Sequence, residues 1–120
     1  MKRDIDLIRA ILLTIEASPT GYGPYPLKVE GYSDEQVGYH AYLLMQGGLV
    51  EGTNKTLPSS TSPLGHARNL TWRGHEFLDA ARDPGIWQTA KERAIAAAGG
   101  ATVPIMYGLL RAAHQRKDGD

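Results

Sequence analysis

The stretch from Gly31 to Glu51 constrains the fold most, because it contains both the start and the stop signals of one helix. Ser33 and Gln36 have the spacing of a capping box, in which each side chain satisfies a backbone amide of the other residue. Gly47–Gly48 then supplies a residue that tolerates positive φ, which commonly ends a helix. Apolar side chains recur between these signals at helical spacing. We therefore predict a helix over residues 34–47 that leads directly into a strand.

The totals of the chain indicate a soluble domain of ordinary composition. Its 120 residues are enough for one domain with its own core. Cysteine is absent, which excludes disulfides, thiolate catalysis and cysteine-type zinc sites. The 13 basic and 13 acidic residues balance, whereas dedicated nucleic-acid binders usually carry a basic face. There is no long apolar run and no signal-peptide pattern, so we expect a cytoplasmic protein without a membrane segment.

Two segments precede the capped helix. Asp4–Ala17 carries a broad apolar stripe at helical spacing and predicts a first helix, which Ser18–Pro19 ends. Three prolines and three glycines make Pro19–Gly31 a loop, within which Leu27–Glu30 alternates like a short strand. The glycines do not form a phosphate-binding loop, since no helix follows at the right distance and Pro24 lacks a donor.

A β-hairpin is predicted after the capped helix. Leu49–Glu51 begins one strand and Ala67–Leu70 is the returning strand. Between them, Gly52–Gly65 has the Ser, Thr, Pro and Gly content of a mobile tip. Thr71 then caps a helix that closes at Asp83–Pro84. The apolar, packing side chains of that helix are Trp72, Phe77, Leu78 and Ala81.

Two more helices are predicted at the C-terminal end. Pro84–Ala98 is rich in good helix formers, with Trp87 as a packing residue, and Gly99–Gly100 breaks it. A last helix spans Val103–Gln115, and the charged tail Arg116–Asp120 frays. The apolar positions of the last helix suit a dimer interface, and they suit folding back on their own domain equally well.

Several motifs resemble those of a known family. The matching motifs are Met1–Arg9, Gly31–Ser33, Tyr39–His40, Gly48–Gly52 and Leu70–Asp79. They resemble a family of short, uncharacterised bacterial and phage proteins, which is known as a domain of unknown function and is often found among mobile-element genes. The resemblance covers Met1 to Trp87 and becomes loose beyond it. It implies no established activity, so it strengthens the fold prediction and leaves function open.

At the level of fold, the exit from the capped helix and the entry to the helix after the hairpin are similar to those of winged-helix regulators of the PadR and MarR types. We expect a mainly helical α+β fold. Residues 1–82 would form a winged helix-turn-helix-like domain with a β-hairpin wing, and residues 83–120 a C-terminal extension of two helices that forms a dimerisation element. One departure is the Pro19–Gly31 segment, where such regulators usually have a short helix.

In such a fold the helix over residues 34–47 would enter the major groove of DNA. Gln36 is suited to adenine edges, and the outward tyrosines are suited to phosphate. Gly38 would permit close approach because it has no side chain on the exposed side. The candidate nucleic-acid-binding residues are Ser33, Gln36, Tyr39, Tyr42, Lys55 and Arg68. Glu35 and Gln46 share the outward face with them.

Charge counts against this interpretation. Residues 33–50 contain two acids and no base, a charge of −2. Residues 51–71 contain Lys55 and Arg68 against Glu51, a charge of +1, so the presumed DNA face carries −1. Typical DNA readers of this fold carry several Lys and Arg there to neutralise phosphates.

Metal and enzyme chemistry find little support. His75 and Asp79 share a helical face at i and i+4, but the second histidine of a zinc-protease helix is missing. Spacing gives no reason to recruit His40 or His66 as a third ligand. We expect His40 at the edge of the core with a ring nitrogen bonded to backbone, and His66 in a loop. No nucleophile lies beside a base, so we predict no enzyme, no cofactor and no metal.

Two function classes remain. The leading interpretation is a small, non-enzymatic transcriptional regulator that binds DNA as a homodimer through its C-terminal helices. The alternative is a protein-interaction module of a mobile element, an antitoxin-like or anti-defence adaptor. It would use the same helix, or the tyrosines of the Pro19–Gly31 loop, on a protein partner. Those tyrosines are Tyr22, Tyr25 and Tyr32, although tyrosines in such a loop usually cover the core.

Overall fold

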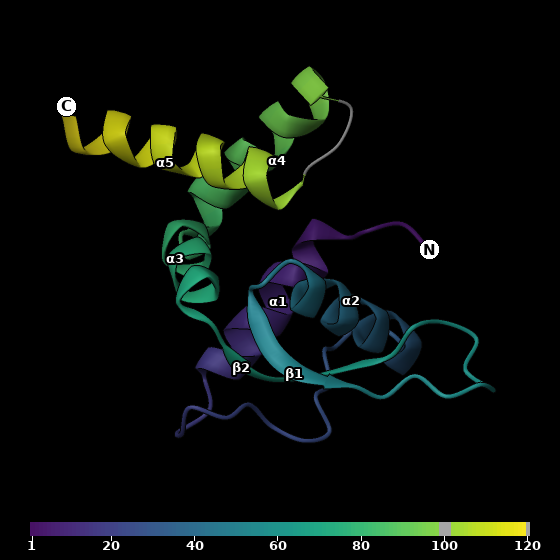
Figure 1. Ribbon diagram of the computed structural model, residues 1–120. Helices are drawn as coiled ribbons and strands as arrows, with labels where there is room; N and C mark the ends of the chain where they lie inside the picture. Colours follow the sequence, from purple (N-terminus) through teal and green to yellow (C-terminus); the bar gives the residue numbers. More distant parts are fainter. Residues whose placement is uncertain (99–101, 120) are drawn as a thin grey trace. The chain divides into compact units, whose positions relative to one another are not determined.

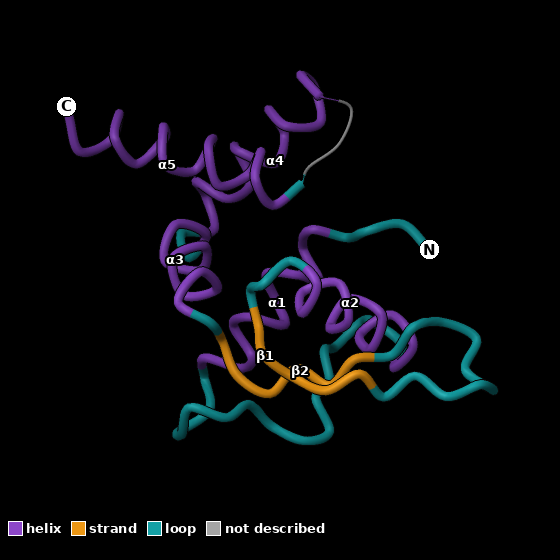
Figure 2. Tube along the Cα trace, viewed as in Figure 1, coloured by secondary structure: helices purple, strands orange, loops and turns teal. Residues whose placement is uncertain are grey.

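The computed structural model describes residues 1–98 and 102–119, and within them the fold is mainly helical α+β (Figures 1 and 2). The elements are, in chain order, α1 (Ile5–Glu16), α2 (Asp34–Gln46), β1 (Val50–Asn54), β2 (Gly65–Leu70), α3 (Trp72–Ala81), α4 (Pro84–Ala98) and α5 (Val103–Gly119). The chain divides into two compact units, residues 1–75 and residues 76–120, with the border inside α3.

Helix α1 supplies the largest part of the core of the first unit. It begins at Asp4, whose carboxylate accepts hydrogen bonds from the backbone N–H groups of Asp6 (3.0 Å) and Leu7 (3.2 Å). It ends at Glu16, ahead of Ser18–Pro19, as predicted. One face packs against α2 and β2. The buried side chains of α1 are those of Ile5, Leu7, Ile8, Ile11, Leu12 and Ile15.

Helix α2 has the boundaries that its signals predict. Both hydrogen bonds of the capping box are present. The Ser33 side chain accepts from the backbone N–H of Gln36, and the Gln36 side chain accepts from the backbone N–H of Ser33. At the other end Gly48 has a φ of 75°, a conformation that glycine adopts without strain. Val37, Ala41 and Leu44 face the core. The helix therefore stops where the chain must turn into β1.

The hairpin is longer than predicted and its tip is correspondingly shorter. β1 and β2 pair antiparallel, with Val50 opposite Leu70 and Asn54 opposite Gly65, so the tip comprises residues 55–64. An irregularity after Glu51 leaves Arg68 as the extra residue of a β-bulge. Both strands lie beside α2, and β2 also packs against α1 (Figure 2).

The segment between α1 and α2 contains neither helix nor strand, so the predicted short strand Leu27–Glu30 is wrong. Its end lies in a turn, because the N–H of Tyr32 donates to the carbonyl of Val29 at 3.2 Å. A single backbone bond, from Gly23 N–H to the carbonyl of Arg68 at 2.8 Å, ties this segment to β2. Lys28 pairs with Asp34, with Nζ 2.8 Å from each carboxylate oxygen.

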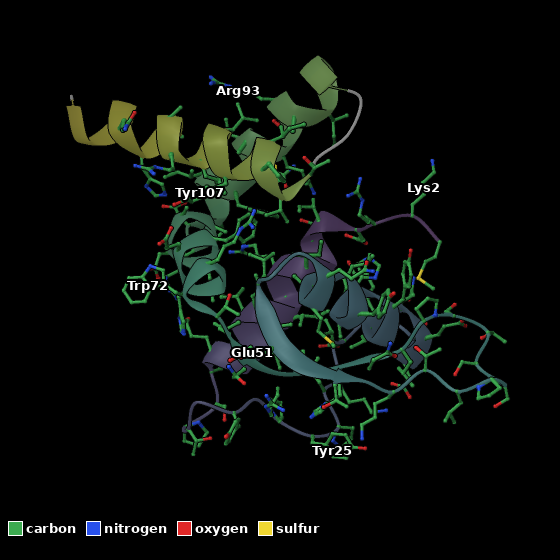
Figure 3. The ribbon with its side chains drawn as sticks, viewed as in Figure 1. Lys2, Tyr25, Glu51, Trp72, Arg93 and Tyr107 are labelled. Atoms are coloured by element: carbon green, nitrogen blue, oxygen red, sulfur yellow. The ribbon has the colours of Figure 1, made fainter. Side chains whose placement is uncertain are left out.

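Thr71 joins the end of the hairpin to α3. Its hydroxyl accepts a hydrogen bond from Gly74 N–H (3.0 Å), which caps the helix as predicted, and donates to the carbonyl of Gly48 (2.6 Å). Trp72 was expected to pack, and this is wrong, since its side chain is 80% exposed and points away from α3 (Figure 3). It stands on the side of the helix opposite to Ala81.

The second unit is built from the end of α3 with α4 and α5. Phe77 and Trp87 are buried edge to face, with ring centroids 6.1 Å apart, and Met106 and Leu110 are fully buried. Nε2 of His114 lies 3.0 Å from the carbonyl of Ala80. Residues 116–119 were expected to fray, but they continue helix α5, which runs to Gly119. The expected break at Gly99–Gly100 lies outside the described residues.

Candidate binding surface of α2 and the hairpin

The outward face of α2 is largely half-buried. Exposure is high for Asp34 and Glu35 in the first turn and for Gln46 in the last turn, and no residue between them is exposed. Tyr39 and Tyr42, which were predicted to contact phosphate, are both half-buried. A partner that approaches α2 therefore meets its two ends and the rims of the tyrosine rings first.

Ser33 and Gln36 are occupied by the capping box. The hydroxyl of Ser33 accepts from Gln36 N–H (3.1 Å), and the side-chain oxygen of Gln36 accepts from Ser33 N–H (2.8 Å). Two donors at the helix start are satisfied in this way. Any base contact by Gln36 would compete with the cap, because the same amide oxygen serves both.

The two predicted tyrosines are placed by different neighbours. The Tyr39 ring lies edge to face with His40, with centroids 5.8 Å apart. The hydroxyl of Tyr42 accepts from Nε2 of Gln46 at 3.0 Å, so the structure brings these two outward residues together. His40 is buried, deeper than the expected core edge, and its Nδ1 lies 2.8 Å from the carbonyl of Gln36, the backbone bond that was predicted.

Both acids in the first turn of α2 have partners inside the protein. Asp34 pairs with Lys28, as described above. Oε1 of Glu35 accepts hydrogen bonds from the hydroxyls of Ser62 (2.6 Å) and Thr61 (2.8 Å) in the hairpin tip. Because these bonds favour the ionised form, Ser62 and then Thr61 hold the pKa of Glu35 below its ordinary value. The sequence offered no spacing pattern that predicts either contact.

The hairpin tip folds back onto α2. Leu64 lies over Gly38, against the position that a Cβ would take there, and Gly38 is buried. The expectation that Gly38 opens the outward face to a partner is therefore wrong, because the missing side chain makes room for Leu64. At Gly65 the backbone of β2 passes so close to the backbone of α2 that a Cβ on Gly65 would lie 2.6 Å from the backbone nitrogen of Tyr42.

The predicted basic residues of the wing both lie on the hairpin. Lys55 is exposed at the start of the tip, and Arg68 is exposed at the bulge, with Nε 3.3 Å from the side-chain oxygen of Asn69. His66 lies between them in β2, not in a loop as expected, and its ring meets that of Tyr25 edge to face at 4.7 Å. Burial first, and then the charges of Lys55 and Arg68, lower the pKa of His66.

The tyrosines of the segment before α2 do not behave alike. Tyr22 and Tyr25 are exposed, so the expectation that loop tyrosines cover the core is wrong for them (Figure 3 labels Tyr25). Tyr32 is half-buried, and its pKa is raised by this burial and then by the negative charge of Asp4. Tyr25 is therefore an aromatic side chain presented to solvent next to the hairpin.

An open groove of about 420 Å³ lies between the 25–28 segment, α2 and the hairpin. Val37, Gly38 and Ala41 of α2 and Gly65 and Ala67 of β2 form its buried lining. Its remaining wall residues include Tyr25, Lys28, Lys55, Leu57, Leu64 and His66. Of the predicted site residues, this groove includes Lys55 alone. The sequence missed it because its walls come from three segments that only the fold brings together.

The described residues provide no metal centre and no membrane span. No three His, Asp or Glu side chains among them gather as a metal ion would require. In the same part of the chain, no helix is both long enough and apolar enough to cross a bilayer.

Comparison with known proteins identifies the family. The chain matches the family described as "Hypothetical protein (DUF2513)" over residues 2–101. It is 40% identical over 92 residues to an uncharacterized protein of Haemophilus influenzae, and the match covers 76% of each chain. No solved structure matches. The predicted resemblance to an uncharacterised family is confirmed, and the match extends beyond Trp87 through α4. The chain belongs to the DUF2513 family.

Proposed function

We propose that this protein is a cytoplasmic, non-enzymatic regulator whose first unit binds duplex DNA as a winged-helix-like module. One observation carries the proposal. A capped helix, α2, leads through residues 47–49 into a hairpin that packs back on it, and the hairpin presents Lys55 and Arg68 to solvent. In winged-helix proteins a helix of this kind enters the major groove and the wing contacts the backbone.

The absence of a helix directly before α2, which departs from the winged-helix fold, limits how the module reads DNA. Winged-helix regulators have a helix before the recognition helix, whereas here residues 17–33 contain none. Gln36 is half of the capping box, so Tyr39, Tyr42 and Gln46 are better placed to meet a groove without loss of local structure. We therefore assign the hairpin cations the larger share of affinity and α2 a smaller share.

The cations outside residues 33–71 do not change the sequence count of −1, because Lys2, Arg3 and Lys28 are accompanied by Asp4, Asp6 and Glu30. Lys28, which that count omits, lies against Asp34. Lys2 and Arg3 are exposed next to Asp4, ahead of α1 (Figure 3 labels Lys2). Exposed cations of this kind gain affinity from counterion release at phosphates.

A homodimer through the second unit is part of the proposal. Met106 and Leu110 are already buried within that unit, so a dimer interface would use the exposed side chains of Ile95 and Ile105 instead. Sedimentation equilibrium tests this directly. A monomer at the concentrations used for DNA binding would remove the dimer from the proposal.

The test of DNA binding is a titration of the purified protein against duplex fragments from its own gene neighbourhood, across a salt series. Affinity that falls steeply with salt and differs between fragments would support a DNA-reading regulator. Absence of binding at low salt would overturn this function.

A specific observation also favours the second candidate, a protein-interaction module. The groove beside α2 carries large exposed apolar side chains at its rim, Tyr25 and Leu57. Exposed apolar patches mark protein interaction sites or ligand grooves, whereas DNA-binding surfaces are more polar and more positively charged. This candidate requires a protein partner whose binding is lost when the groove is altered.

A further inference from the structure

We infer that the groove between the 25–28 segment, α2 and the hairpin binds an extended segment of a partner protein in which apolar residues stand next to carboxylates. The inference rests on the second candidate function and is independent of DNA binding. It concerns residues of the first unit alone.

The floor of the groove calls for an apolar occupant. Val37, Ala41 and Ala67 are almost fully buried there, and Gly38 adds only backbone. Among the described residues, no buried side-chain nitrogen or oxygen lacks a hydrogen-bond partner, so the floor offers no polar group in need of one. A polar ligand placed there would lose its hydration without compensation, whereas an aliphatic or aromatic side chain would gain by leaving water.

The size and rim of the groove favour a peptide over an ion or a small polar molecule. A volume of about 420 Å³ lies in the lower part of the range for ligand pockets and holds a few side chains. Tyr25 is 77% exposed and Leu57 is 62% exposed, so apolar surface continues outward from the cavity. An extended segment covers both the cavity and these rims, and a compact ligand covers only the cavity.

The charges at the rim favour an acidic segment. Both lysines of the groove are exposed, but the charge of Lys28 is paired with Asp34, whereas that of Lys55 is not paired within the described residues. The Nζ of Lys55 has no hydrogen-bond or ion-pair partner among the residues that the structure describes. Burial first, and then the charges of Lys55 and Arg68, lower the pKa of His66, and the contribution of the two cations places positive potential at this wall. A carboxylate next to an apolar anchor would meet that potential.

The experiment uses the full-length, isotope-labelled chain and three hexapeptides observed by amide chemical shifts. The probe is Ac-Ser-Asp-Leu-Phe-Glu-Ser-NH2. One matched peptide replaces both acids with lysine, and the other replaces Leu-Phe with Ala-Ala. We expect the probe to shift the amides of Val37, Ala41, Leu57 and Leu64, and the lysine peptide to bind at least roughly fivefold more weakly at low salt.

Variants locate the contacts without touching the core. Lys55→Glu should weaken the probe about two- to fivefold, the usual range for an exposed charge pair, and Leu57→Ser should weaken it at least as much. The matched controls are Lys2→Glu and Trp72→Ser, an exposed cation and an exposed apolar residue that do not line the groove. They should change probe affinity by less than about twofold, the scale of neutral surface substitutions.

Each alternative outcome overturns the inference in a recognisable way. Equal binding of the acidic and lysine peptides would remove the charge argument. Shifts of the same amides on raising protein concentration without peptide would assign the groove to a second copy of the chain. Shifts confined to residues outside the groove would overturn the inference and leave an interaction module standing at another surface. No shifts with any peptide would overturn the inference. If no protein partner is found at any other surface either, the second candidate function is overturned as well.

Discussion

The backbone N–H of Asp4 donates a hydrogen bond of 2.8 Å to Nε2 of His40, which joins the start of α1 to the middle of α2. Because Nε2 accepts this bond, the ring proton sits on Nδ1 and is donated to the carbonyl of Gln36 at 2.8 Å. His40 is 1% exposed, so the imidazole is a buried connector between two backbones.

Removal of this acceptor should destabilise the first unit. His40→Phe keeps an aromatic side chain, although a larger one, and leaves the Asp4 N–H without its partner. An unsatisfied buried donor costs about 1–3 kcal/mol, and the added volume acts in the same direction. We expect the free energy of unfolding in urea to fall by that amount. The matched control, His75→Phe, changes an exposed histidine and should stay within about 0.5 kcal/mol of the parent. Equal stability of the two variants would contradict the connecting role of His40.

The contact between Glu35 and the hairpin tip should depend on pH. Ser62 and Thr61 lower the pKa of Glu35, so their bonds are fully formed above the ordinary Glu pKa of about 4.3 and are lost as pH falls through the lower, folded value. A carbon-detected titration of the Glu35 carboxyl should give a midpoint below that of an unfolded glutamate.

Two serines of the hairpin tip test whether the bond from Ser62 lowers the pKa of Glu35. Ser62→Ala removes the shorter of the two bonds to Glu35, so the midpoint should rise toward the ordinary value. Ser59→Ala changes an exposed serine of the same tip and should leave the midpoint where it is. A midpoint unaffected by Ser62→Ala would mean that the tip does not hold this carboxylate in solution.

Elements whose signals are local could be predicted from the sequence. The capping box at Ser33 and the stop at Gly48 are satisfied by neighbours within a few residues, so spacing alone reveals them. The contacts of the candidate surface are different, since Glu35 meets Ser62 and Gly38 meets Leu64 only after the hairpin has folded back. No periodicity connects such pairs.

The exposure of Trp72 could have been predicted from its position in the sequence. Ala81 follows it by nine residues, and at about 100° per residue the two side chains lie half a turn apart on α3. Phe77 and Ala81 are on the buried side, so Trp72 must face away from it. The apolar character of Trp72 favours packing, but its angular position on α3 places it on the exposed side, and the position decides.

The two tryptophans should therefore report opposite environments. Trp72 is 80% exposed and Trp87 is 4% exposed. With Trp87→Phe, the remaining indole should emit at long wavelength and be quenched readily by acrylamide. With Trp72→Phe, emission should shift to shorter wavelength and quenching should weaken several-fold. Similar quenching of the two variants would mean that Trp72 is covered in solution, as it would be in an oligomer that buries the start of α3.

The strongest test of the DNA proposal is the salt dependence of hairpin variants. Each phosphate contact contributes a slope of about −0.9 to the plot of log affinity against log salt. If Lys55 and Arg68 each meet one phosphate, the double change Lys55→Ala with Arg68→Ala should make the slope shallower by about 1.8 and weaken all fragments alike. Gel-shift or anisotropy titrations on one duplex at several salt concentrations measure it.

A control from the second unit separates specific contacts from general charge. Arg93→Ala removes an exposed cation that lies outside the hairpin, and it should leave the slope unchanged (Figure 3 labels Arg93). An equal loss of slope in the control would mean that binding follows net charge and not the wing. An unchanged slope in the hairpin double variant, with binding retained, would move the DNA contact away from β1 and β2 and leave Lys55 to the groove, where its charge is available for a peptide carboxylate.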